Sequence, residues 1–262
     1  MKDVKVIIAT HKKYYMPKDK LYLPIHVGAK GKENLGYQKD SDGKNISKKN
    51  PYFCELTGLY WAWKNLKADY IGLVHYRRYL TIKKRFGKTT EEKFKNVLKL
   101  SDVNKLLNDT DIILPKKRKY YIENLYDHYK HTMFIEPLDE TRNILKEKHP
   151  EYLKEFDRLH VRTSAHMFNM FIMKKNILND YCKWLFDILF ELDKRMKDKE
   201  YDSFHSRFYG RVSELLLDVY INTNNLSYKE INFMNMENIN WWKKGTSFLK
   251  AKFLGKKYEK SF

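Results

Sequence analysis

The chain has 262 residues, of which 42% are hydrophobic and 15% aromatic, so its composition is that of a folded globular protein and excludes a disordered one. Its formal net charge of +19 favours an anionic partner, such as nucleic acid, an anionic membrane surface or a phosphorylated substrate, although a lysine-rich genome can produce part of this excess without function. No run approaches the roughly 20 apolar residues that cross a bilayer, and the N-terminal apolar run is too short for a signal peptide.

The N-terminal third of the chain predicts two strands, a long loop and a helix. Residues 4–10 form a β-branched run that ends in a polar loop, which predicts a strand. Residues 28–50 are rich in Gly, Lys, Asp and Asn, and an irregular segment of this length indicates a binding loop. Residues 51–67 begin with proline and repeat apolar side chains about one helical turn apart. The apolar run of the next strand stops abruptly at His75.

The rest of the chain alternates helices and strands in the same way. Residues 81–99 form a basic insertion that we expect to be exposed, and Ser101 can cap a short helix. The remaining predicted elements are a strand at 111–115, a basic turn that enters a helix at 116–133, helices at 138–148 and 151–160, a strand at 166–175, helices at 176–196 and 210–221, and a strand at 227–233. Cys54 and Cys182 lie in apolar helical patterns, which predicts packed, reduced thiols in a cytoplasmic protein.

This alternation predicts one α/β domain, residues 1–240, with a mostly parallel sheet flanked by helices, followed by a basic amphipathic tail at 241–262. Ligands of open α/β sheets bind beyond the carboxyl ends of the strands. We therefore expect the loops after Thr10, Val74, Leu114 and Met173 to form one rim. The tail carries seven lysines and one glutamate between residues 243 and 262, interleaved with Phe and Leu.

The segment HYRRY at 75–79 carries the densest candidate site. Arginine offers two parallel hydrogen bonds to a phosphate or carboxylate, and His75 can act as a base, a donor or a ligand. Adjacent arginines in an extended segment point to opposite faces, so only one of Arg77 and Arg78 would face a given cleft. The alternative is that His75 packs in the core and both arginines form surface ion pairs.

Several carboxylates could transfer a proton. Glu55 lies in an aromatic helix, where burial would raise its pKa, whereas an ion pair with Arg211 is the simplest explanation of Glu214. Nucleotide-binding glycine loops, zincin motifs and the hydrolase nucleophile elbow are absent from the sequence. An Asp-x-Asp pair at a strand end is also absent, and the DSDG segment at 40–43 is interpreted as a turn.

Taken together, several segments resemble the DUF4422 glycosyltransferases of bacterial capsular polysaccharide, exopolysaccharide and O-antigen clusters. They cover most of the chain from Val4 to about Ile231: PIHVGA, NISKKNPYFCELTGLYWAWKN, YIGLVHYRRYL, DIILPKKRKYY, FNMFIMKK, YCKWLFDILFELD and GRVSELLLDVYI. The resemblance implies a GT-A-like, Rossmann-type fold that binds a nucleoside diphosphate sugar. One branch of the family is similar to inverting galactofuranosyltransferases, which makes UDP-galactofuranose the expected donor, with another UDP-hexose as the alternative.

The resemblance also implies roles for particular residues. His75, Arg77 or Arg78 would stabilise the departing diphosphate, with or without Mn²⁺ or Mg²⁺, because His75, Tyr76 and Arg77 occupy about the position of the Asp-x-Asp in the usual GT-A layout. The expected catalytic residues are Glu55, Glu214 and His75. The expected donor-binding residues are Thr10, His11, Lys12, Gly28, Ala29, Asn45, Tyr60, His75, Tyr76, Arg77 and Arg78. The expected acceptor-binding residues are Trp63, His131, Asn169 and Met170, and no residue is assigned to a metal.

The same resemblance implies a lipid-linked saccharide acceptor at the cytoplasmic face of the cell membrane. Peripheral attachment of the basic tail to anionic lipid fits this location, while a solvated or packed tail is the alternative. Two rival functions stay open: a basic nucleic-acid-binding protein and a membrane-bound scaffold without activity. No RRM, KH or helix-turn-helix pattern is present, so we expect no nucleic-acid partner.

Overall fold

The computed structural model describes residues 2–85, 87–237 and 252, and the chain divides into two compact units. The first unit comprises Met1–Lys116, Phe168–Lys183 and Ser227–Glu237, and the second comprises Lys117–Met167, Trp184–Leu226 and Asn238–Phe262. The predicted domain boundary at residue 240, and the predicted tail except for Lys252, fall outside the described residues. Within the described part of the chain, no helix has the length and apolar character needed to cross a membrane.

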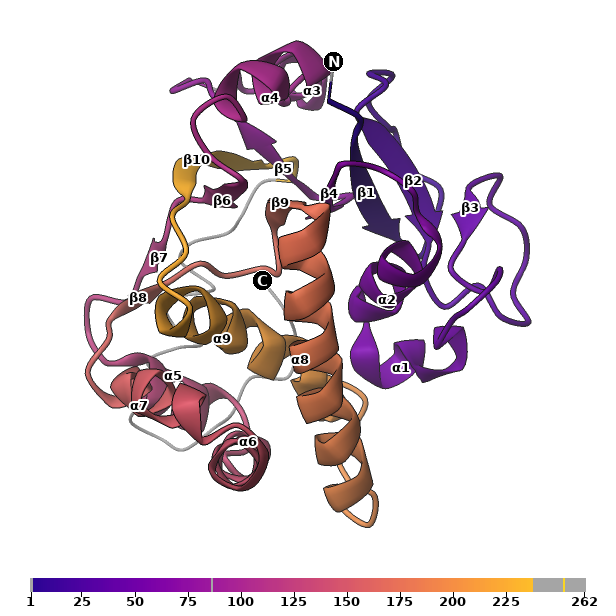
Figure 1. Cartoon of the computed structure of the whole chain (residues 1–262). Helices are drawn as coiled ribbons and strands as arrows, with labels where there is room; N and C mark the ends of the chain where they lie inside the picture. The colour runs from indigo at the N-terminus through magenta and orange to yellow at the C-terminus, as the bar shows by residue number, and fades with distance from the viewer. Residues whose placement is uncertain (1, 86, 238–251, 253–262) are drawn as a thin grey trace. The chain divides into compact units, whose positions relative to one another are not determined.

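The first unit is built on a sheet whose first four strands are parallel (Figure 1). Strand β1 (Val4–Thr10) pairs with β2 (Tyr22–His26) on one side and with β4 (Tyr70–His75) on the other, and β2 also pairs with β3 (Gln38–Lys39). Strands β1 and β4 are buried along almost their whole length, which agrees with their continuous apolar sequences. The predicted strands at 4–10 and up to His75 are confirmed, whereas β2 and β3 were not predicted.

The other strands of this unit make the sheet mixed. They are β5 (Arg78–Thr81), β6 (Ile112–Pro115), β9 (Phe171–Lys174) and β10 (Lys229–Asn235). Strand β4 pairs antiparallel with β5 and with β9, whereas β6 and β10 pair parallel to each other. The unit therefore has an eight-stranded α/β sheet, as expected. The sheet is mixed and not mostly parallel, which corrects the prediction.

The direction of β9 corrects the predicted rim. Because β9 runs against β4, the loop after Met173 lies at the opposite edge of the sheet from the loops after Thr10 and Val74. The start of β9, with Asn169 just before it, reaches the rim instead.

Two glycines allow close packing in the sheet layer. A Cβ on Gly72 of β4 would lie 2.7 Å from the Phe171 carbonyl oxygen of β9 and 2.8 Å from a side-chain carbon of Ile172. A Cβ on Gly58 would lie 2.9 Å from Val27, so helix α2 packs directly against the face formed by β1 and β2 (Figure 1). The small side chain is therefore required by the neighbours of both positions.

The helices of the first unit differ from prediction at two places. The expected helix at 51–67 is broken at Cys54 into α1 (Asn50–Phe53) and α2 (Leu56–Asn65), and Ser47–Lys49 forms a 3₁₀ turn before it. The expected exposed insertion contains α3 (Thr90–Lys95), which Thr89 and Glu92 begin with a capping box. Its Phe94 is buried in the core, whereas the described residues between 82 and 92 are exposed, as expected. Helix α4 (Leu100–Leu106) follows, and it begins before Ser101.

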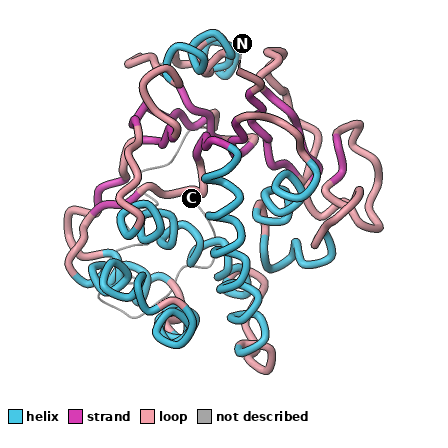
Figure 2. The backbone as a smooth tube through the Cα atoms, viewed as in Figure 1, coloured by secondary structure: helices cyan, strands magenta, loops and turns pink. Residues whose placement is uncertain are grey.

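The second unit is mainly helical (Figure 2). Its elements are the two-stranded pair β7 (Arg118–Lys119) and β8 (Ser164–Ala165), helices α5 (Leu125–Thr132), α6 (Glu136–Lys148), α7 (Leu153–Asp157) and α9 (Phe208–Thr223), and the 3₁₀ turns Pro150–Tyr152, Arg158–His160 and His205–Arg207. Helix α8 (Lys175–Arg195) contributes its residues from Trp184 onward. The rings of Tyr152, Trp184 and Tyr220 pack together in its core.

Candidate functional site

The carboxyl ends of β1, β2 and β4 lie at one edge of the sheet, which is the rim that the sequence predicts. The register places Thr10 beside His26 and Ala9 beside His75, so the ends of three neighbouring strands deliver polar side chains to the same place. Strand β10 is parallel to β6 and antiparallel to β5, so Asn235 at its end also reaches this edge. The candidate site is therefore built in the first unit, on strand ends and on the loops that follow them.

Glu55 reaches the rim because the chain kinks just before it. Cys54 has φ 51° and ψ −127°, an unusual conformation for a residue with a side chain, and it ends α1. The Asn50 side-chain amide donates to the Cys54 carbonyl at 2.7 Å, which stabilises the kink. Helix α2 then starts, with Glu55 at its N-cap position, where the positive end of the helix dipole favours a carboxylate.

A second kink brings Asn169 to Glu55. Phe168 and Asn169 have φ of 78° and 52°, two consecutive left-handed residues that only Met170 separates from β9. Asn169 is almost fully buried, and its side-chain amide donates to Glu55 Oε1 at 2.7 Å. The predicted carboxylate and the predicted polar interruption of the strand are thus in direct contact, although 114 residues separate them in the sequence.

His75 completes this cluster through the same kink. Its Nε2 lies 2.5 Å from the Phe168 carbonyl oxygen, and because a carbonyl can only accept, Nε2 carries the proton. Burial lowers the pKa of His75 below its ordinary value of 6.5, the charge of Glu55 opposes this, and Arg78 adds to it. At neutral pH His75 is therefore a neutral donor that fixes the Phe168 backbone beside Asn169.

The two arginines do not share one extended segment, because Arg77 lies in a turn and Arg78 begins β5, and this corrects the predicted alternation. Tyr76 and Arg77 form the turn between β4 and β5, and His75 pairs with Arg78 across it. The Arg78 guanidinium lies 4.4 Å from the centre of the Phe168 ring, and its Nε donates to Asn235 at 3.0 Å.

Arg77 has a different environment from Arg78. Its side chain is 40% exposed and forms a 3.5 Å ion pair with Glu237. Arg78 is therefore the arginine that belongs to the His75 cluster, whereas Arg77 lies at its outer side.

The loop after β1 packs against the same turn. Tyr76 is buried, and the rings of His11 and Tyr14 lie 5.5 and 5.1 Å from its ring. The Lys12 ammonium lies 5.2 Å from the Tyr76 ring centre, and the buried Thr10 hydroxyl donates to the Lys12 carbonyl at 2.7 Å. The predicted donor residues that follow β1 and β4 are thus neighbours, and both His11 and Lys12 are exposed.

The loop at 28–50 is organised by Asp40, a residue that the sequence analysis placed in a turn. Its fully buried carboxylate accepts from the Gly28 and Ala29 backbone N–H groups at 2.7 and 3.0 Å. It also accepts from the Ser47 and Thr57 hydroxyls at 2.5 and 2.6 Å. These N–H groups of Gly28 and Ala29 therefore shape the loop, and their predicted contact with the donor stays a prediction.

The other predicted residues lie around the site or in the second unit. Asn45 donates to the Ser41 and Gly43 carbonyls and braces the same loop. Tyr60 and Trp63 pack edge to face on α2, and Met170 is fully buried. Glu214 and His131 belong to the second unit, where Glu214 lies 3.9 Å from Arg211 and His131 Nδ1 lies 2.8 Å from Glu123.

Three groups of the cluster were not predicted from the sequence: the Phe168 carbonyl, Asn235 and Glu237. A backbone carbonyl has no signature in the sequence, and although asparagine adopts the left-handed conformation more readily than most residues, nothing in the sequence marks Phe168 as left-handed. Among the described residues, no three His, Cys, Asp or Glu side chains gather in a way that could hold a metal ion.

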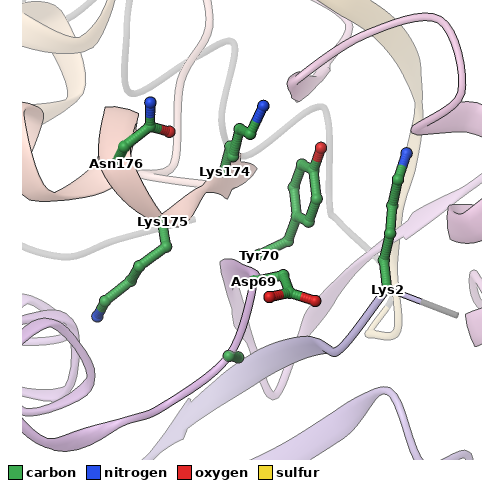
Figure 3. A pocket seen from close by; sticks show the side chains of 7 residues that line it. Lys2, Asp69, Tyr70, Lys174, Lys175 and Asn176 are labelled. Carbon is green, nitrogen blue, oxygen red and sulfur yellow. The ribbon is translucent and has the colours of Figure 1, made fainter.

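A surface pocket of about 510 Å³ also occurs in the first unit, but at the other edge of the sheet (Figure 3). It is lined by Lys2, Asp69, Tyr70 and Lys174, among others, which lie where β4 begins and β9 ends. The Tyr70 hydroxyl donates to Asp111 at 2.7 Å, and Lys174 forms an ion pair with the same carboxylate. Tyr70 and Lys174 are thus both bound by Asp111, and the strand ends of the candidate site are not part of this pocket.

Among solved structures, the chain is similar to the apo structure of the WbbM bifunctional glycosyltransferase, with 31% sequence identity and a TM-score of 0.82. The match covers 90% of this chain and 46% of that one, so the chain spans less than half of that protein's length. No curated protein matches the chain.

The chain therefore has the α/β fold of a glycosyltransferase, and this similarity supports the predicted enzyme class. The family model described as "Domain of unknown function (DUF4422)" matches residues 5–225, which is most of the chain. The predicted resemblance is confirmed, and the chain belongs to the DUF4422 family.

Proposed function

We propose that the protein is a glycosyltransferase that moves a sugar, with inversion, from a nucleoside diphosphate sugar to a saccharide hydroxyl. The observation that carries this proposal is the hydrogen bond between Asn169 and Glu55 at the rim of the sheet, next to His75 and Arg78. A carboxylate held in a fixed orientation and a cationic group close to it are the two elements that such a transfer requires. The similarity to a glycosyltransferase structure supports the same reaction class.

In the proposed reaction, the acceptor hydroxyl attacks the anomeric carbon and Glu55 takes its proton. The bond between the anomeric carbon and the diphosphate oxygen breaks, and its electron pair leaves with the diphosphate. Arg78, with Lys12 and Arg77 at the outer side, stabilises the charge that develops on the leaving group. Asn169 leaves one Glu55 oxygen for the acceptor, and His75 holds the Phe168 backbone in place.

The donor and acceptor follow from the family resemblance. UDP-galactofuranose is the donor we favour, another UDP-hexose is the alternative, and the acceptor is a lipid-linked saccharide of a bacterial surface polysaccharide. A polyprenyl-linked acceptor lies at the cytoplasmic face of the cell membrane, so we place the protein there as a peripheral protein. The basic tail contributes to this attachment, and its removal at residue 243 should lower membrane association without abolishing turnover of a soluble acceptor.

The test is UDP release by the purified full-length chain, supplied with a panel of UDP-sugars and a synthetic lipid-linked acceptor. The Glu55→Gln variant should lose about 10²- to 10⁴-fold in kcat, because the amide cannot accept the proton, while UDP affinity changes little. The matched control is Glu33→Gln, which removes an exposed glutamate from a loop of the same unit.

Two results would contradict the proposal at different levels. Full turnover by Glu55→Gln would exclude Glu55 as the base and make Glu214 the next residue to test. The proposed enzyme activity would be excluded if no donor of the panel were turned over and calorimetry showed no binding of UDP. Tight, salt-sensitive binding to oligonucleotides in that case would favour the nucleic-acid alternative.

A further inference from the structure

Three apolar side chains of the second unit are exposed to an unusual degree. Tyr121 is 89% exposed, Val161 is 72% exposed and Ile122 is 61% exposed. Among the described residues, these are the three most exposed of the large hydrophobic side chains. Burial of such groups is favourable, so their exposure in one small region indicates a surface that another apolar phase covers.

These side chains come from two segments that lie side by side. Lys119 of β7 pairs with Ser164 of β8, the Tyr120 backbone N–H donates to the Thr163 carbonyl at 2.7 Å, and the Leu125 N–H donates to the Arg162 carbonyl at 2.8 Å. The chain between Tyr120 and Leu125 therefore runs along the segment that carries Val161. We call the three side chains Tyr121, Ile122 and Val161 the apolar tip.

Positive charge lies beside the apolar tip. The segment 117–122 contains Lys117, Arg118 and Lys119 and no acidic residue, whereas Arg158 and Arg162 of the neighbouring segment both form ion pairs with Glu155 and add little net charge. The nearest acidic side chain along the first segment is Glu123, which is only 4% exposed. It accepts from His128 and His131 at 2.9 and 2.8 Å, so it presents little negative charge to the surface.

The described residue of the tail lies at the same place. The Lys252 ammonium donates to the Ile122 carbonyl at 3.4 Å and lies 3.8 Å from Glu123. This contact adds one more cation beside the apolar tip.

We propose that the apolar tip and the cations around it form a docking surface for an anionic lipid membrane. Tyrosine and branched aliphatic side chains partition into the boundary between headgroups and acyl chains, and lysine and arginine are attracted to anionic headgroups. A nucleic acid would match the cations but would leave the apolar side chains in water, and three apolar side chains are few for a stable protein interface, which involves about 20–30 residues a side. The docking surface presupposes the peripheral location given under the proposed function. It adds which residues of the chain contact the membrane.

The test is cosedimentation of the full-length protein with vesicles of phosphatidylcholine alone or mixed with phosphatidylglycerol. The wild-type protein should bind the mixed vesicles and bind phosphatidylcholine vesicles much more weakly, and added salt should weaken binding. The Tyr121→Ser/Ile122→Ser variant should bind the mixed vesicles about tenfold more weakly or worse. The Lys119→Gln variant should lose about fivefold, which corresponds to about 1 kcal/mol per basic residue at the surface.

The matched controls are Tyr52→Ser/Ile82→Ser, which removes one exposed tyrosine and one exposed isoleucine of the first unit, and Lys199→Gln. Both should bind vesicles as the wild type does. Equal binding by the tip variant and its control would overturn the proposal, as would equal binding to both kinds of vesicle. Loss of binding only when residues 243–262 are removed would assign the contact to the tail instead.

Turnover separates this proposal from the proposed function. All four variants should keep wild-type turnover on a soluble acceptor, because their side chains lie outside the proposed catalytic cluster. If no donor is turned over but vesicle binding still depends on Tyr121 and Ile122, the docking surface stands and the glycosyl transfer fails. If turnover is normal and the tip variant still binds vesicles fully, the docking surface fails and the glycosyl transfer stands.

Discussion

His75 and Asn169 each hold a different group of the site in place at the rim. The one N–H of the neutral His75 ring donates to the Phe168 carbonyl, and the Asn169 side-chain amide donates to Glu55. The sequence indicated the importance of His75, Asn169 and Glu55, because each is a polar residue in an apolar pattern. Their mutual contact was not predictable, since it depends on the two left-handed residues before β9 and not on any periodic pattern.

The two arginines should respond differently to substitution. Arg78→Ala should lower kcat/KM for the donor by about 10²-fold or more, because the guanidinium nearest to His75 is lost where the diphosphate charge develops. Arg77→Ala should change it less than about fivefold, because this side chain is exposed and paired with Glu237. Steady-state kinetics with a soluble acceptor measures both effects, and equal losses in the two variants would contradict the assignment.

His75 should also make folding stability depend on pH. Its folded pKa is lowered by burial, so between that pKa and about 6.5 the unfolded chain binds more protons than the folded chain. The stability from the neutral ring is thus complete above pH 6.5 and is lost as the pH falls towards the folded pKa.

The measurement is urea unfolding of the wild type and of His75→Gln across this range. The wild type should lose more unfolding free energy per pH unit, by up to about 1.4 kcal/mol, than the variant does. The exposed His160 supplies the control as His160→Gln, whose slope should match the wild type. Identical slopes for His75→Gln and the wild type would show that the imidazole is not held neutral.

At the scale of elements, strands β1 and β4 and helices α8 and α9 follow their sequence patterns, because burial on one or both faces imposes a clear period. The departures occur where local chemistry overrides the period. The helical pattern at 51–67 continues through Cys54, but the Asn50 amide stabilises a kink there. The loop at 28–50 has no period at all, and its shape depends on the buried carboxylate of Asp40.

Asp40 should be the residue on which this loop depends. In Asp40→Asn, one acceptor oxygen becomes a donor that faces N–H and O–H groups, so the variant should lose about 2–4 kcal/mol of unfolding free energy. Asp42→Asn is the control, because Asp42 is exposed and its carboxylate accepts only from Gln38 among the hydrogen bonds described for it. Chemical denaturation measures the difference, and equal stabilities would contradict the role of Asp40.

Gly72 gives a second test at this scale. An added methyl group would meet the Phe171 carbonyl at 2.7 Å, so Gly72→Ala should push β9 from β4 and destabilise the protein by about 1–3 kcal/mol. Gly36→Ala is the comparison, because no atom lies within 4 Å of its added methyl group and only its φ of 78° opposes the change. This second variant should lose about 1 kcal/mol. The reverse order of stabilities would show that β9 can shift freely.

At the scale of the whole molecule, the charge of +19 is large enough to act on an anionic donor before any contact forms. The family and the α/β class were predictable from the sequence, because the segments that carry the resemblance are spread over most of the chain. The division into two units was not, because each unit takes segments from three parts of the chain.

Added salt should therefore weaken binding of the proposed UDP-sugar donor and leave the rate of the chemical step unchanged. Raising KCl from about 20 to about 200 mM should increase KM for the UDP-sugar several-fold, because the screening length falls below about 10 Å, while kcat stays constant. A rise in kcat or an unchanged KM would show that the overall charge takes no part in donor binding.

The left-handed backbone at Cys54 has a consequence for how this sequence can change. A residue with a side chain in that conformation destabilises the fold by about 1 kcal/mol or more, and glycine would remove part of this penalty. Variants selected only for heat resistance should therefore accumulate glycine at position 54, whereas the contacts of the Phe168 ring with Arg78 and Phe233 oppose the same change at position 168. We expect such survivors to transfer sugar more slowly, because a looser backbone no longer holds Glu55 in register. Selection for stability and selection for turnover would thus act in opposite directions at this one residue.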